Sequence, residues 1–155
     1  MVTMRSNKTI QVIVFNLGDE KYGVEISQVR EIIRPSKITR IPNAPDFVEG
    51  VINLRGQVTT IINLRKRFGL PPKDIDNDTR IIVVEYNGAV IGMMVDTVSE
   101  VKYLSAEDIE PLPNIITSRS EAKFLKGIGK LPDGLLILID LNKVLSDEEV
   151  ENIKM

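Results

Sequence analysis

Residues Phe47 to Phe68 read FVEGVINLRGQVTTIINLRKRF. Two short runs rich in β-branched residues, Gly50 to Leu54 and Val58 to Leu64, flank the tripeptide Arg55-Gly56-Gln57. Runs of this kind on either side of a glycine-containing turn are typical of a β-hairpin. The stretch therefore predicts two antiparallel strands joined by a tight turn that carries an arginine.

Three further pairs of strand-like runs surround short turn signals. Asn-Gly is the strongest of these signals, because both central residues of a type I′ turn need a positive φ. Helical segments are expected to be minor, one running from Ser27 through Ile33 and one following Ser146. Many short strands separated by turns predict a mainly β fold. The three pairs are Ile10–Leu17 with Lys21–Ile26 around Gly18-Asp19, Ile81–Tyr86 with Ala89–Val95 around Asn87-Gly88, and Gly127–Leu131 with Leu135–Ile139 around Asp133-Gly134.

Part of the opening stretch recurs in the second half of the chain. The recurring segments keep their order and their approximate spacing, which favours an internal duplication. The alternative is a chance likeness between two antiparallel patterns of strands and turns. The matched segments are Phe47–Val51 with Phe124–Ile128, Ile62-Asn63-Leu64 with Ile139-Asp140-Leu141, and Tyr22-Gly23-Val24 with Ile91-Gly92-Met93.

Such a duplication predicts one domain over residues 1–155 made of two small barrels, each of about five strands. The first barrel is expected over residues 10–70 and the second over residues 79–145, followed by a C-terminal helix or tail over 146–155. Two barrels packed together leave a groove along their junction, and ligands commonly bind in such grooves.

Composition excludes several classes of function. Cysteine and histidine are both absent, which removes thiol nucleophiles, imidazole bases and the usual zinc ligands. We therefore expect no enzyme activity, no metal and no cofactor. The net charge of -2 comes from interspersed acidic and basic residues and creates no field that attracts nucleic acid. No apolar run approaches the roughly 20 residues that span a bilayer, so we expect a cytoplasmic protein without membrane insertion, whose partners are proteins.

Two alternative functions stay open from the residues alone. A nucleic-acid-binding β-barrel would use the basic run Arg65-Lys66-Arg67-Phe68, although the chain has only 4 Phe, 3 Tyr and no Trp to stack on bases. A small hydrolase would have to use carboxylates alone, and we interpret the densest acidic region as a solvated surface instead. The members of that region are Asp96, Glu100, Glu107, Asp108 and Glu110.

Arg55 is the most unusual residue of the predicted hairpin turn. The simpler interpretation is an exposed charge, and the sharper one is a guanidinium that grips carboxylates or carbonyl oxygens of a partner. Val29, Ile32 and Ile33 lie at near-helical spacing with Glu31 between them. One helical turn cannot bury all three on one face, so we expect some apolar surface to remain for a partner.

The segment Phe47–Phe68, with Gly-Val-Ile-Asn-Leu-Arg-Gly at its centre, resembles the central segment of the CheW family of chemotaxis coupling proteins. The resemblance implies two SH3-like five-stranded β-barrel subdomains packed together, with a few short helices. It also implies a non-catalytic cytoplasmic adaptor that couples chemoreceptors to the histidine kinase CheA and is recruited to membrane-associated receptor arrays. The other similar segments are Tyr22–Ile32, Ile41–Pro45, Ile91–Glu100 and Phe124–Leu141.

The same resemblance implies roles for individual residues. Positions matched to binding of the cytoplasmic tip of chemoreceptors are Val29, Glu31, Gly50, Arg55, Ile81 and Val98. Positions matched to binding of the CheA regulatory domain are Ile38 and Val58. The segment around Glu110 and Ile115 matches a possible contact between neighbours in a receptor array.

Overall fold

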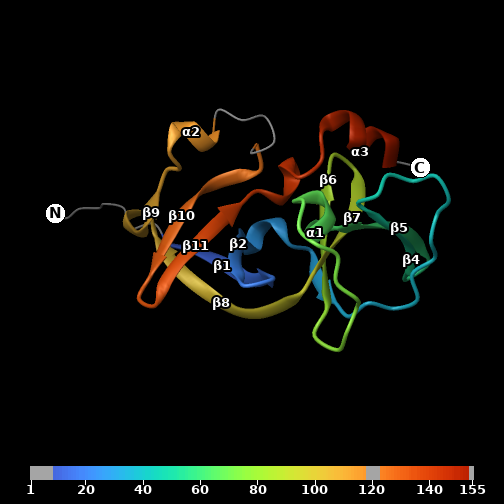
Figure 1. Cartoon of the computed structure of the whole chain (residues 1–155), viewed down its shortest axis with the longest axis horizontal. Helices are drawn as coiled ribbons and strands as arrows, with labels where there is room; N and C mark the ends of the chain where they lie inside the picture. The colour runs from blue at the N-terminus through green and yellow to red at the C-terminus, as the bar shows by residue number, and fades with distance from the viewer. Residues whose placement is uncertain (1–8, 118–122, 154–155) are drawn as a thin grey trace.

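The computed structural model describes residues 9–117 and 123–153 (Figure 1). The chain forms two β-sheets and several short helical segments, which confirms the predicted mainly β class. The six-stranded sheet, in the order β8-β1-β2-β11-β10-β9, contains β1 (Thr9–Leu17), β2 (Glu20–Glu25), β8 (Thr97–Ser105), β9 (Ile109–Glu110), β10 (Leu125–Leu131) and β11 (Gly134–Ile139). The five-stranded sheet, in the order β3-β6-β7-β5-β4, contains β3 (Glu31–Ile33), β4 (Val48–Leu54), β5 (Gln57–Asn63), β6 (Arg80–Tyr86) and β7 (Ala89–Val95). The helical segments are η1 (Ile26–Gln28), α1 (Leu64–Arg67), η2 (Ala106–Asp108), α2 (Asn114–Thr117), η4 (Leu141–Lys143) and α3 (Asp147–Ile153).

The predicted boundaries of the two halves, 10–70 and 79–145, are wrong, because one sheet takes strands from both ends of the chain. The hairpin β1–β2 joins β8 to β11 in the six-stranded sheet, while β3 to β7 form the other sheet. The chain changes sheet between β2 and β3 and again between β7 and β8. In Figure 1, β1 and β2 accordingly lie beside β11 and far from β4 and β5. Hairpin signals in a sequence are local, whereas the choice of the neighbouring hairpin depends on long-range packing.

The internal repeat is visible in the register of the two sheets. In the six-stranded sheet β11 runs parallel to β2, with Leu138 opposite Gly23. In the five-stranded sheet β5 runs parallel to β7, with Ile61 opposite Gly92. The sequence match places Gly23 on Gly92, and the same match extended by one residue places Leu138 on Ile61. The two sheets therefore repeat one arrangement, in which the second strand of one hairpin runs parallel to the second strand of another hairpin: β2 with β11 in one sheet and β5 with β7 in the other.

Side chains from both sheets build a central core. Ile13 and Phe15 of β1 lie in this core, whereas the alternate residues Val12 and Val14 lie in a separate core of the six-stranded sheet. β6 divides its side chains in the same way, and Ile81 belongs to the separate core of the five-stranded sheet. Strands that are buried on both faces read as continuous apolar runs rather than alternating ones. The central core holds the two sheets together and thereby fixes their relative position.

The short helical segments differ in part from the prediction. The predicted helix from Ser27 to Ile33 is wrong: η1 ends at Gln28, and the next residues form β3, whose pairing with β6 satisfies the extended backbone. The predicted C-terminal helix is confirmed as α3. Its first turn is capped reciprocally, because the Glu149 amide donates to Ser146 Oγ (3.1 Å) and the Ser146 amide donates to Glu149 Oε1 (2.8 Å). None of the helices in the described residues is long and apolar enough to cross a membrane.

Candidate functional site

The turn between β4 and β5 contains two residues with positive φ, Arg55 (51°) and Gly56 (87°). The Gly56 amide donates a hydrogen bond of 2.7 Å to the side-chain oxygen of Asn53. The first position of such a turn usually holds asparagine, aspartate or glycine, as in the turn Asn87-Gly88 of the same sheet. An arginine with positive φ strains the backbone, and within the described residues its side chain makes no hydrogen bond that stabilises the turn itself. The backbone of this turn therefore does not require an arginine, and a functional role for Arg55 would have to come from its side chain.

The guanidinium of Arg55 forms an ion pair with Glu31 of β3, in which Nη2 donates to Oε2. β3 and β4 are the two outer strands of the five-stranded sheet, so this ion pair connects the tip of one edge hairpin with the opposite edge strand. The Arg55 side chain is still 67% exposed, which leaves guanidinium donors open to a partner. The structure thus brings together two of the residues predicted to bind receptors.

Gly50 lies inside β4, at a bulge where the register to β5 shifts. Its φ is +147°, and an added Cβ would lie 2.3 Å from the carbonyl oxygen of Thr39. The backbone at Thr39 therefore approaches Gly50 more closely than a side chain would allow. The matching residue Gly127 is similar, since its added Cβ would lie 2.8 Å from the carbonyl oxygen of Glu110. Gly50 contributes through its backbone, by letting the chain at Thr39 pack against β4.

The other three predicted receptor-binding residues differ in accessibility. Val29 lies in the segment between β2 and β3, Val98 lies near the start of β8, and each is half-buried against the central core. Ile81 is fully buried in the core of the five-stranded sheet. Its side chain does not reach the surface, so a direct receptor contact is not expected of it.

The two predicted kinase-binding residues lie along the β4–β5 hairpin. Val58 is 52% exposed and borders a hollow of about 660 Å³ between this hairpin and the β6–β7 turn. Val90 of β7 and Ile153 of α3 also line the hollow. Ile38 precedes Thr39, the residue that bridges to β4, and it lines a smaller hollow of about 300 Å³. One hairpin and its outer edge therefore carry both kinds of predicted binding residue.

Leu135 occupies the position on β11 that corresponds to Val58 on β5. Val58 is the second strand residue after its turn and lies opposite Asn53, and Leu135 is the second after its own turn and lies opposite Lys130. Leu135 is 64% exposed. The turn before it is formed by Pro132 and Asp133, because Leu131 pairs with Gly134; the expected turn at Asp133-Gly134 is wrong by one residue. The fold thus contains a matched pair of exposed apolar positions, one in each sheet.

Glu110 and Ile115, the predicted array contact, lie at the far edge of the six-stranded sheet. Glu110 belongs to β9, and its carboxylate lies 2.9 Å from the ammonium group of Lys130. Ile115 lies in α2 and is 81% exposed. Neither residue belongs to the five-stranded sheet that carries Arg55 and Val58, so any contact that they make is separate from that of the β4–β5 hairpin.

The basic run that favoured nucleic-acid binding makes contacts within the protein. Arg67 pairs with Glu149 at 2.9 Å and lies 4.5 Å above the ring of Phe47. Phe68 stacks on Phe124 with ring centroids 4.4 Å apart. Because α1 uses these groups to hold α3 and the second hairpin, they do not form a stacking platform for bases.

Two polar clamps at the sheet crossings were not predicted from the sequence. Asp96, interpreted there as part of a solvated surface, is only 9% exposed; its Oδ2 accepts from Arg65 Nη1 (2.6 Å) and from the Gly18 amide (2.7 Å). At the other crossing, Gln28 Nε2 donates to Asp140 Oδ1 at 2.7 Å. Asp96 directly follows a fully apolar strand, and this position was the available signal that its carboxylate is enclosed.

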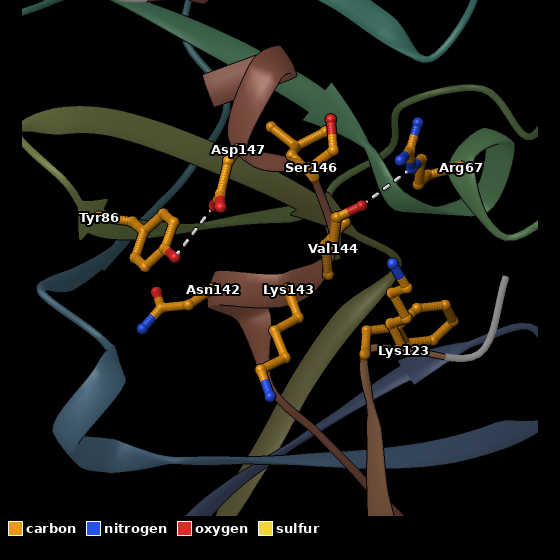
Figure 2. Close-up of a pocket in the computed structure, with 10 residues that line it drawn as sticks. Arg67, Tyr86, Lys123, Asn142, Lys143, Val144, Ser146 and Asp147 are labelled. Atoms are coloured by element: carbon orange, nitrogen blue, oxygen red, sulfur yellow. Dashed lines mark hydrogen bonds between the residues drawn. The ribbon is translucent and has the colours of Figure 1, made fainter. Parts of the chain in front are cut away.

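A cavity of about 760 Å³ lies between α1, the end of β6 and the chain from η4 to α3 (Figure 2). Figure 2 shows Tyr86 directed toward Asp147, with a hydrogen bond of 3.3 Å from the tyrosine hydroxyl. On the other side Arg67 Nε donates to the carbonyl oxygen of Val144 at 2.9 Å. These contacts hold the start of α3 and the residues before it against β6 and α1. We therefore interpret the cavity as part of the packing around the C-terminal helix.

The fold is an internally repeated two-sheet β domain in which one hairpin, β4–β5, carries both the exposed Arg55 and the exposed Val58. The chain belongs to the CheW family: the family model of the CheW-like domain matches residues 11–149. It is 41% identical to the chemotaxis protein CheW of Klebsiella aerogenes, over 90% of this chain and 84% of that protein. It is 34% identical to the chemotaxis protein CheW of Helicobacter pylori, over 92% of this chain and 86% of that protein. The crystal structure of the scaffolding protein TtCheW from Thermoanaerobacter tengcongensis is similar, with a TM-score of 0.80, 38% identity, and coverage of 88% of this chain and 92% of that one.

Proposed function

We propose that this protein is a cytoplasmic adaptor that couples chemoreceptors to the histidine kinase CheA by binding both, without catalysing a reaction. Membership of the CheW family supports a role in chemotaxis. The observation that carries the proposal is Arg55, an exposed arginine placed at a strained turn position and paired with Glu31. A side chain held in this way is suited to recognising a partner.

The proposed receptor contact is formed by the Glu31–Arg55 ion pair together with the half-buried Val29 and Val98. The ligand is the helical hairpin at the cytoplasmic tip of a receptor, whose apolar side chains would pack against the two valines. The ion pair presents both signs of charge and so fixes the register of the helices. Arginine is favoured in such contacts because its planar group of donors is pre-organised.

The proposed kinase contact is the apolar surface around Val58, with Ile38 along the outer edge of the same hairpin. Its ligand is the regulatory domain of CheA, which we expect to be a β domain of the same CheW-like kind. An exposed valine beside a hollow of about 660 Å³ offers a position where a side chain of another β domain can be buried. Glu110 and Ile115 are proposed as a separate contact between neighbours in a receptor array, where the protein would be recruited beneath the membrane.

The proposed mechanism is a shift of kinase populations. The adaptor holds receptor and kinase in a fixed mutual geometry, and a receptor movement alters the relative stability of the kinase conformations. This requires a difference in affinity between receptor states and no chemical step. The rigid central core and the two polar clamps at the sheet crossings would keep the two contacts at a constant distance.

The test is the substitution Arg55→Glu, measured by binding to a receptor cytoplasmic fragment. Loss of an arginine anchor costs about 2 kcal/mol or more, so we expect affinity for the receptor to fall by about 30-fold. Binding to CheA and the thermal melting curve should stay close to those of the wild type, because exposed ion pairs contribute little to stability. The matched control is Asp133→Lys, a charge reversal at the corresponding turn of the other sheet. If Arg55→Glu binds receptor as well as the control does, Arg55 is not part of the receptor site.

A further inference from the structure

The long edge strand β8 has an outer side without a strand partner in the described part of the chain. It is nine residues long and pairs with β1 along its inner side. The other outer strands are short or covered: β9 has two residues, β3 has three, and Thr39 bridges to Val51 on β4. A free edge of this length is a template on which another extended chain can pair.

The exposed side chains of β8 alternate between apolar and charged residues. Val101 is 47% exposed and Tyr103 is 67% exposed. Glu100 and Lys102 flank Val101, with side-chain exposures of 44% and 33%. Charges on an edge strand normally prevent unspecific pairing. Here, however, the two charges have opposite signs and are placed symmetrically about Val101.

We propose that β8 pairs antiparallel with β8 of a second copy of this chain, about a two-fold axis at Val101. In this register Glu100 of each copy lies opposite Lys102 of the other, and Val101 lies opposite Val101. Opposite charges that face each other across an antiparallel pair stabilise it, whereas like charges destabilise it. The sequence Glu-Val-Lys is therefore complementary to itself in this register.

Both faces of the joined sheet support this arrangement. Alternate residues of a strand point to opposite faces, so the four charges gather on one face while Val101 and Tyr103 gather on the other. Within one chain Lys102 Nζ already lies 3.8 Å from Glu100 Oε1, and pairing extends this contact into a cluster of alternating sign. The Tyr103 hydroxyl accepts a hydrogen bond of 2.9 Å from Gln11, which fixes the ring beside β1 and leaves it open to the diagonal Val101 of the second copy.

The size of the contact sets its strength. One pair of nine-residue strands buries less than the roughly 1,200–2,000 Å² of a stable protein interface. We therefore expect a weak dimer that forms at high local concentration. This self-association needs neither receptor nor kinase, so it stands or falls separately from the proposed coupling role.

Cysteine cross-linking of the full-length chain tests the register directly, because the sequence contains no native cysteine. Two cysteines that face each other on an antiparallel pair fall within the Cα separation that a disulfide spans. We expect Val101→Cys to form a covalent dimer under mild oxidation. The matched control is Tyr103→Cys, whose two cysteines would be about 13 Å apart along the strand axis and should not link. A mixture of Tyr103→Cys with Ser99→Cys should give the cross-linked pair.

Charge reversal distinguishes pairing in this register from random collision. Adding Glu100→Lys to Val101→Cys places lysine opposite Lys102 at both ends of the contact and should lower the cross-linking yield about ten-fold. Adding Lys102→Glu as well restores opposite charges and should restore the yield. The proposal is overturned if Val101→Cys stays monomeric or if Tyr103→Cys alone cross-links equally well. It is also overturned if Glu100→Lys lowers the cross-linking yield and the further substitution Lys102→Glu does not restore it.

Discussion

The hairpin units β4–β5–α1 and β10–β11–η4 have the same backbone construction but different tips. In the first, the Asn63 amide donates to the Phe47 carbonyl at 2.7 Å, and in the second, the Asp140 amide donates to the Phe124 carbonyl at 2.8 Å. Each unit also has a glycine at its bulge. The tips differ, since the first turn carries Arg55. Features that the fold requires, such as the bulge glycine, are repeated in both units, whereas Arg55 lies where the units differ.

The largest effect is expected from a direct comparison of the two bulge glycines. Gly50→Ala should lower the free energy of unfolding by about 3 kcal/mol, because its Cβ meets the Thr39 carbonyl oxygen at 2.3 Å and its φ is unfavourable for a side chain. Gly127→Ala has 2.8 Å to the Glu110 carbonyl oxygen and should cost about 1–2 kcal/mol. Urea denaturation measures both losses. Equal losses of stability, or a larger loss at Gly127, would show that neither the closer carbonyl oxygen nor the positive φ makes Gly50 the more constrained glycine.

The second comparison is between the corresponding apolar residues Val58 and Leu135. Val58→Asp should weaken binding to the CheA regulatory domain by about 30-fold, because burial of a carboxylate in an apolar contact is unfavourable. Leu135→Asp introduces the same charge at the matching exposed position and should leave the affinity unchanged. Isothermal titration calorimetry with the purified domain checks both variants. Equal loss in the two variants would contradict a kinase site confined to the first unit.

The smallest effect concerns α3, which follows the second unit. Burial raises the pKa of Glu149, but hydrogen bonds from the Ser146 amide and from Arg67, with the positive charge of Arg67, outweigh burial and hold this pKa below its usual value. A lowered pKa in the folded state means that the carboxylate stabilises the fold above the unfolded-state pKa and loses this contribution as the pH falls through the folded value. Because the side chain is partly exposed, the effect should stay below about 1 kcal/mol.

The pH dependence can be assigned to this residue by substitution. Thermal melting of the wild type between neutral pH and pH 3 should show a loss of stability on the acid side that Glu149→Gln reduces. Glu148→Gln, at the neighbouring exposed position, serves as the control and should leave the curve unchanged. If Glu149→Gln and the wild type lose the same thermal stability between neutral pH and pH 3, Glu149 is not the source of the pH dependence.

The sequence was sufficient for features that depend on local chemistry. Apolar runs and glycine-containing turns predicted most strands, and the capping pattern at Ser146 predicted α3. It failed where the outcome depends on partners distant in the chain. β1 and β2 were predicted to belong with β4 and β5, but they pair within the six-stranded sheet. Glu31–Ile33 was predicted to be helical, but its pairing with β6 makes it a strand. Burial of Ile81 likewise depends on chain segments distant in the sequence, whereas burial of Asp96 had a local signal in its position directly after an apolar strand.

The candidate site shows the same division. The position of Arg55 in a turn follows from the sequence around it. The ion pair between Arg55 and Glu31 could not be predicted in this way, because it connects the turn of the β4–β5 hairpin with β3, the strand at the opposite edge of the sheet. Which of the matched residues are exposed enough to bind a partner, such as Val58 but not Ile81, was decided by the three-dimensional packing.

Bridging of receptor to kinase is the most direct test of the proposed function. A receptor cytoplasmic fragment is immobilised, CheA is added, and the retained CheA is measured with no adaptor, with the wild-type chain, with Arg55→Glu and with Val58→Asp. We expect the wild-type chain to increase CheA retention markedly and either substitution alone to remove this increase. Retention of CheA that does not depend on this chain, or that survives both substitutions, would show that the chain does not couple receptor to kinase through these two residues.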